Sequence, residues 1–104
     1  EDNLGYVYEY LVAQMLRAAG NELFYYTFPA ENGNKNYEVD FLLSRGSKIV
    51  PIEVKSSGYK AHKSLDAFCE KFSSRIGKRI LLYTKDFQKD GATLCVPIYF
   101  TALL

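Results

Sequence analysis

Two runs of apolar, β-branched and aromatic residues, 37–44 and 48–55, dominate the hydrophobic pattern of the chain. Gly46 and Ser47 stand between them, and a two-residue loop beginning with glycine is typical of a type II′ hairpin turn. Such a turn pairs the residues on either side of it and so fixes the register of the strands. The pattern therefore predicts an antiparallel hairpin over residues 37–55.

This register sorts the side chains of the hairpin onto two faces. It places Asp40 opposite Glu53, and Glu38 opposite Lys55. Because side chains alternate along a strand, these four are expected to leave the same face. The residues of the other face are all apolar: Val39, Phe41, Leu43, Val50, Ile52 and Val54. One face is thus predicted to be core, and the other to gather three carboxylates and one ammonium.

Ahead of the hairpin, the pattern predicts a helix and a strand. Apolar residues recur at helical spacing from Leu4 to Ala19, and Gly20 is a natural helix stop. Residues 22–28 are predicted to form a strand that ends at Pro29. A polar loop with Lys35 near its tip then leads into the hairpin.

After the hairpin, Ser64 is expected to cap a helix whose apolar face runs from Leu65 to Ile76, and Gly77 to stop it. Residues 79–83 are almost continuously apolar, as in a strand buried on both faces. A strand, a helix and a strand joined by a long connector imply a parallel crossover. The remaining segments are predicted to be a charged loop, an edge strand and an apolar closing helix: 85–90, 92–96 and 97–104.

These elements predict an α/β fold with the order α-β-β-β-α-β and a mixed central sheet flanked by helices. At 104 residues and 48% hydrophobic content, the chain fits a single domain over residues 1–104. The sequence starts at Glu1, almost inside a helix, so we interpret it as a domain excised from a longer protein. No stretch approaches the ~20 apolar residues of a membrane span. Cys69 and Cys95 fall at apolar positions, which favours buried free thiols in a reducing cytosol and a cytoplasmic protein.

The polar face of the hairpin suggests a metal site. Two carboxylates a few ångströms apart repel each other unless one is protonated or a cation lies between them. Mg²⁺ takes such oxygen ligands, and a neighbouring lysine can position water or stabilise a phosphate. The alternative is a salt-bridged hairpin, with an ion pair between Glu38 and Lys55 and with Asp40 and Glu53 solvated.

The segments V-D-F-L-L and I-V-P-I-E-V-K-S, which contain Asp40, Glu53 and Lys55, resemble the metal-binding hairpin of the PD-(D/E)XK superfamily, the restriction-endonuclease-like fold. More narrowly, the chain resembles the domain that closes many prokaryotic AAA-type ATPase-like proteins. The segments G-Y-V-Y-E-Y-L-V, K-S-L-D-A-F and V-P-I-Y-F-T-A-L-L carry that likeness along nearly the whole chain. Related domains range from nucleases to inactive binding modules.

The resemblance implies roles for individual residues. Asp40 and Glu53 would bind Mg²⁺ or Mn²⁺, helped by the carbonyl of Val54, and Lys55 would stand beside the attacking water. Glu9 on the first helix would supplement the metal site. For Glu9, an ordinary solvent-facing glutamate or an ion pair with the arginine two turns on is an equal alternative.

Basic residues near this face would suit a nucleic acid. Lys60 and Lys63 follow the metal motif, and we expect them, with Lys35, to contact phosphate. His62 is expected to be a loop residue rather than a catalytic base. The net charge of +1 argues neither for nor against nucleic acid.

Three functions remain open. The first is a Mg²⁺-dependent phosphodiesterase acting on DNA. The second is a catalytically inactive nucleic-acid-binding or regulatory module. The third is a structural or protein-interaction domain that packs on an N-terminal ATPase part of the same chain. A homo-oligomer is compatible with each of them.

Overall fold

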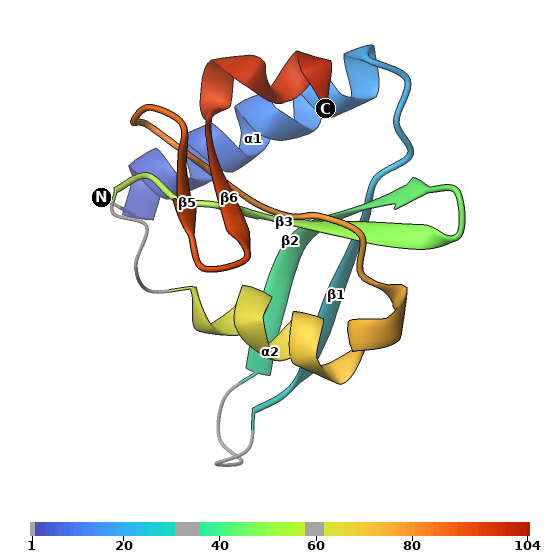
Figure 1. Cartoon of the computed structure of the whole chain (residues 1–104). Coiled ribbons are helices and arrows are strands. Elements are labelled where there is room, and N and C mark those ends of the chain that lie inside the picture. Colours follow the sequence, from blue (N-terminus) through green and yellow to red (C-terminus); the bar gives the residue numbers. More distant parts are fainter. Residues whose placement is uncertain (1, 31–35, 58–61) are drawn as a thin grey trace.

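A mixed six-stranded sheet forms the centre of the molecule, with the strand order β1-β2-β3-β4-β6-β5 (Figure 1). The computed structural model describes residues 2–30, 36–57 and 62–104. The helices are α1 (Asp2–Ala18), α2 (Lys63–Lys71) and two 3₁₀ segments, η1 (Ser73–Arg75) and η2 (Ile98–Leu103). The strands are β1 (Phe24–Pro29), β2 (Asn36–Arg45), β3 (Lys48–Val54), β4 (Arg79–Tyr83), β5 (Gln88–Asp90) and β6 (Thr93–Pro97). The predicted α/β class and the order α-β-β-β-α-β are confirmed.

The β2–β3 hairpin has the predicted turn and register. Arg45 pairs with Lys48, and Leu42 with Pro51. Gly46 has a φ of +64° while Ser47 does not have a positive φ, which distinguishes type II′ from type I′.

The pairing of β2 with β3 ends earlier than the sequence predicts. It runs only as far as Phe41 and Ile52, whereas β2 stays paired with β1 back to Asn36. The expected ladder pairs of Asp40 with Glu53 and of Glu38 with Lys55 are therefore wrong. Figure 1 shows the reason, because the first half of β2 bends away from β3 and follows β1 across α2.

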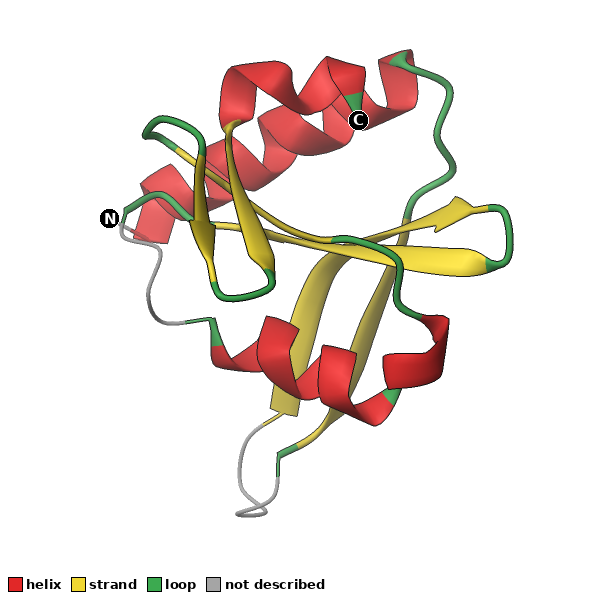
Figure 2. Ribbon diagram, in the orientation of Figure 1, coloured by secondary structure: helices red, strands yellow, loops and turns green. Residues whose placement is uncertain are grey.

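Helices cover both faces of the sheet, with α1 and η2 on one face and α2 on the other (Figure 2). The main core lies under α1, where Val12 and Leu16 are fully buried. It includes the predicted apolar residues Leu43, Val50, Ile52 and Val54 of the hairpin, together with Ile80, Leu82 and Val96. The parallel pairing of β3 with β4 confirms the predicted crossover through α2.

Aromatic residues fill the space between α2 and β1. Phe68 and Phe72 lie 4.8 Å apart between ring centroids, and Tyr26 meets both rings edge-on at 5.7 and 5.6 Å. Phe28 stacks on Tyr26 at 5.6 Å. These rings pack the core, as their positions in predicted strands and helices indicate.

Three predicted helix features differ from the structure. Helix α2 already ends at Lys71, and His62 rather than Ser64 is its N-cap residue. The hydroxyl of Ser64 instead accepts the backbone N–H of Glu38 at 3.3 Å, so it ties α2 to β2. Gly77 does not stop the helix. It lets the chain pass beside β3, where a Cβ atom on Gly77 would come within 3.2 Å of the Cβ of Lys48.

The C-terminal strands also differ from the prediction. The expected charged loop contains β5, which pairs antiparallel with β6, and β6 is an interior strand because it also pairs with β4. The closing helix is confirmed as helical, in a 3₁₀ form. Cys69 and Cys95 are buried and free, as expected. No described helix has the length and apolar character needed to cross a membrane.

Candidate functional site

The candidate site begins where β2 leaves β3. There, the carboxylate of Asp40 accepts the backbone N–H of Val54 at 2.8 Å. The side chain thus occupies the position that a carbonyl of β2 would hold if the ladder continued. The half-buried carboxylate of Asp40 therefore replaces a backbone partner of Val54 at the point where β2 bends away from β3.

Glu53 and Lys55 form the second part of the site. The ammonium of Lys55 lies 3.3 Å from Oε2 of Glu53, and the two side chains are 30% and 13% exposed, respectively. The other carboxylate oxygen, Oε1 of Glu53, is buried and has no hydrogen-bond partner among the described residues. A buried carboxylate oxygen without a partner is costly, so a proton, a water molecule or a cation at this atom would stabilise it. Lys55 pairs with Glu53 and not with Glu38, so the solvated, salt-bridged alternative does not describe this hairpin.

Asp40 and Glu53 hold their protons more tightly than free carboxyl groups do. Burial raises the pKa of Asp40 to about 7, against the hydrogen bond from Val54, and the charges of Glu9, Glu53 and Glu38 add to the rise. Burial also raises the pKa of Glu53, although the charge of Lys55 opposes this change. Four carboxylates therefore share one electrostatic environment around Asp40.

Helix α1 brings Glu9 to this environment. Burial and the charge of Glu38 raise the pKa of Glu9. A hollow of about 430 Å³ is lined by Glu9 together with Glu38 and Asp40, and a second hollow of about 340 Å³ by Glu9 together with Val54 and Lys55. Glu9 thus stands between the two hollows, and both of them border the acids of the hairpin.

A family model described as "Domain of unknown function (DUF4143)" matches residues 4–101. The chain belongs to the DUF4143 family. No curated protein matches the chain. The family description names no activity.

The described part of the DUF4143 domain does not contain a complete metal shell. Within residues 2–30, 36–57 and 62–104, no group of three or more His, Cys, Asp or Glu side chains is arranged to hold a metal ion. The charges of Glu53 and Glu9 act on Asp40, but the three carboxylates are not arranged as ligands around one point. Their oxygens are nevertheless the donor type that Mg²⁺ and Mn²⁺ prefer.

The predicted phosphate-binding lysines are only partly located. Lys63 is the first residue of α2 and its side chain is exposed. Lys35 and Lys60 lie outside the described residues. Their contact with phosphate stays a prediction.

His62 links helix α2 to strand β5 in the DUF4143 domain, although it was predicted as an ordinary loop residue. It is 7% exposed, and its ring nitrogens lie 2.8 Å from Asp66 and 2.7 Å from Asp90. Burial alone lowers its pKa, but the hydrogen bonds to Asp90 and Asp66 outweigh burial and raise it. The four-residue spacing of His62 and Asp66 is a signal in the sequence, whereas Asp90 comes from β5, which was predicted as a loop.

Proposed function

We propose that this domain is a metal-dependent nuclease of the PD-(D/E)XK type, which hydrolyses phosphodiester bonds of DNA. The observation that carries the proposal is the buried, unpartnered Oε1 of Glu53, beside the ammonium of Lys55 and within the electrostatic reach of Asp40. The ammonium of Lys55 lies against Oε2, so Oε1 of the same carboxylate can accept a further cation.

The residues present supply the donor atoms that a hard divalent ion prefers. Asp40 and Glu53 would hold Mg²⁺ or Mn²⁺, and the resemblance to the superfamily adds the carbonyl of Val54. When bound, such an ion makes water a stronger nucleophile and stabilises negative charge on phosphate. Burial is the main cause of the raised pKa values of Asp40, Glu53 and Glu9, and it favours the protonated forms of these acids. A bound cation would instead stabilise their charged forms.

The remaining residues would orient the substrate. The ammonium of Lys55, held 3.3 Å from Glu53, can donate a hydrogen bond to water or to a phosphate oxygen at this site. Glu9 borders both hollows and can accept a hydrogen bond from that water. Lys35, Lys60 and Lys63 would contact the phosphate backbone, where cations supply most of the affinity for DNA. An N-terminal ATPase part and a cytoplasmic location belong to the same proposal.

A second candidate is a catalytically inactive nucleic-acid-binding or protein-interaction module of an AAA-type ATPase. The outer side of α1 favours it, because Leu4, Val7 and Leu11 lie at helical spacing and are 48%, 50% and 44% exposed. Tyr6 and Tyr10 on the same helix are 70% and 65% exposed. An apolar stripe of this kind is typical of a surface that packs on another protein.

Calorimetric titration of Mn²⁺ and Mg²⁺ into the domain, alone and with a DNA duplex, separates the two candidates. The nuclease proposal expects saturable binding that Asp40→Asn and Glu53→Gln both abolish, whereas Glu70→Gln on the exposed side of α2 leaves it unchanged. Cleavage of labelled DNA by the wild type and its loss in Lys55→Met would complete the test. A folded domain that binds neither ion, even with DNA present, would be an interaction module.

A further inference from the structure

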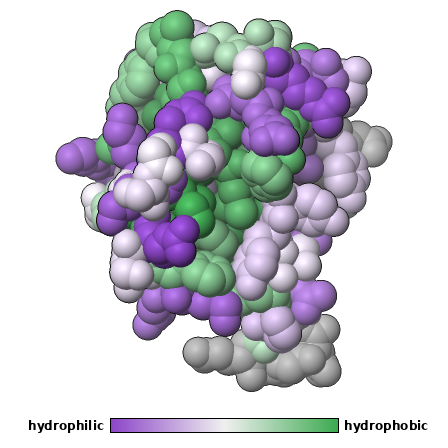
Figure 3. Space-filling model, turned by 90° about the vertical axis from the view of Figure 1, so that its right-hand side faces the viewer, coloured by the Kyte–Doolittle hydropathy of each residue, from purple (hydrophilic) through white to green (hydrophobic). Residues whose placement is uncertain are grey.

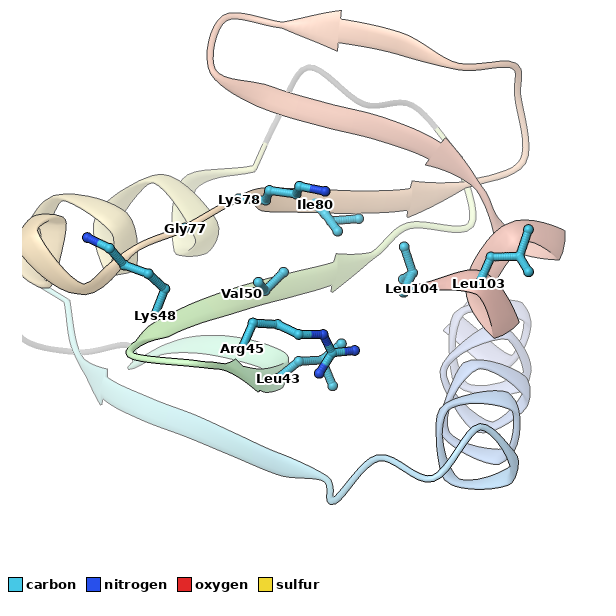
Figure 4. A pocket seen from close by; sticks show the side chains of 9 residues that line it. All are labelled: Leu43, Arg45, Lys48, Val50, Gly77, Lys78, Ile80, Leu103 and Leu104. Carbon is cyan, nitrogen blue, oxygen red and sulfur yellow. The ribbon is translucent and has the colours of Figure 1, made fainter.

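A separate pocket lies near the turn of the β2–β3 hairpin (Figure 4). Asp40 and Glu53 lie at the other end of the hairpin, beyond the pair of Phe41 with Ile52. The volume of the pocket is about 390 Å³, near the lower end of the sizes typical of small-molecule sites. The pocket is lined by residues of β2, β3 and β4, of the segment just before β4, and of the last two positions of the chain. These residues are Leu43, Arg45, Lys48, Val50, Gly77, Lys78, Ile80, Leu103 and Leu104. None of these residues belongs to the acidic site.

The floor of the pocket is apolar. Leu43, Val50 and Ile80 are core residues, 2%, 6% and 4% exposed, and they form its base. Leu103 and Leu104 close one side, and Leu103 is 77% exposed. From the end of the molecule that carries the hairpin turn, Figure 3 shows apolar surface bordered by hydrophilic residues. Apolar lining of this kind gains free energy when an apolar group displaces water from it.

The rim of the pocket is cationic. In Figure 4, the side chains of Arg45 and Lys78 approach the apolar floor from opposite sides, while Lys48 points away. The ammonium of Lys48 donates to the carbonyl of Ser74 at 3.1 Å. The guanidinium of Arg45 donates to Oδ1 of Asn21 at 3.0 Å, which holds it in position. No described acidic residue lines the pocket.

We propose that this pocket binds a medium-chain fatty acid. The alkyl chain would lie on Leu43, Val50 and Ile80, and the carboxylate would lie between Arg45 and Lys78. An anion is favoured because no Asp or Glu side chain of the lining neutralises the cations of the rim. An alkyl chain suits the floor better than a nucleobase does, because the apolar side chains there would leave the polar edges of a base without hydrogen bonds.

The test is a titration of decanoate, well below its micelle concentration, into ¹⁵N-labelled domain followed by NMR. The expected result is saturable shifts of the amides of Leu43, Val50, Gly77 and Ile80. Decanol, which lacks the charge, should bind about tenfold more weakly, and acetate, which lacks the chain, should give no saturable shift. Arg45→Gln and Lys78→Gln should each weaken decanoate binding about threefold to fivefold, as one exposed ion pair would.

Lys85→Gln is the matched control, because it removes one exposed cation outside the pocket. It should bind decanoate like the wild type, and the amide spectrum of each variant reports whether it is folded. Lys78→Gln decides the question if Arg45→Gln is unfolded, since the latter also loses the bond to Asn21. The proposal is overturned if decanoate gives no saturable shift, if decanol binds as well as decanoate, or if the shifts fall on the exposed side of α1.

Discussion

The carboxylate of Asp40 accepts the backbone N–H of Val54 at 2.8 Å, across the gap that opens where β2 turns away from β3. The bond forms whether Asp40 is charged or neutral, because either form has an oxygen that accepts. Asp40 is therefore part of the backbone architecture of the hairpin as well as a candidate metal ligand. This double role makes the choice of substitution at position 40 important.

Asp40→Ala should destabilise the domain relative to Asp40→Asn. Alanine leaves the N–H of Val54 without its acceptor, which costs about 1–3 kcal/mol, whereas the amide oxygen of asparagine can replace the carboxylate. Urea unfolding at pH 5, where Asp40 is mostly neutral in the folded protein, measures the difference. Asp86→Ala serves as a control at an exposed acid. Equal stability of the two Asp40 variants would contradict this role for the bond.

The pKa of Asp40, about 7, predicts that the domain loses stability as the pH rises. The unfolded chain releases this proton near its ordinary pKa of 3.8, but the folded protein keeps it until about pH 7. Between these values the folded state binds more protons, so stability falls with pH, by on the order of 4 kcal/mol from Asp40 alone. Asp40→Asn removes this contribution. It should match the wild type near pH 4 and exceed its stability at pH 8, and equal slopes for the two proteins would contradict the prediction.

Lys55→Met should raise the pKa of Glu53 further. The ammonium of Lys55 lies 3.3 Å from Oε2 of Glu53 and favours the charged carboxylate, which lowers the pKa of Glu53. Methionine removes this charge, so the effect of burial, which raises the pKa, is larger in the variant. The titration of the ¹³C-labelled carboxyl group of Glu53 measures the change by NMR. Lys55→Arg keeps the charge and should give a smaller shift, and Lys85→Met should give none. A Glu53 titration unaffected by Lys55→Met would show that the ion pair is absent in solution.

His62→Gln should destabilise the domain by about 1–3 kcal/mol at pH 6, because it removes charge-assisted hydrogen bonds to Asp66 and Asp90. The folded pKa of His62 is raised, so its contribution is complete below the unfolded pKa and is lost as the pH rises through the folded pKa. The advantage of the wild type in urea unfolding should therefore be largest near pH 6 and smaller at pH 9. An advantage of constant size would show that packing, rather than the ion pairs, accounts for the effect.

Local patterns in the sequence determine much of this protein. The alternation of apolar residues in β2 and β3, with the Gly46-Ser47 turn, predicts the hairpin, its register near the turn and its buried face. These features follow from periodicity and turn geometry, which act over a few residues. The carboxylates of Asp40 and Glu53 could be singled out for the same reason, because they interrupt apolar strands.

Only the tertiary structure decides the rest. The bend of β2 depends on its pairing with β1 and on the bond from Val54 to Asp40, and neither is visible in the local pattern. Strand β5 is charged and exposed, and it forms because β6 offers it a free edge. That edge brings Asp90 to His62, 28 residues away in the sequence. Such contacts depend on which segments, far apart in the sequence, pack together and on how far they exclude water. The local sequence pattern of one segment determines neither.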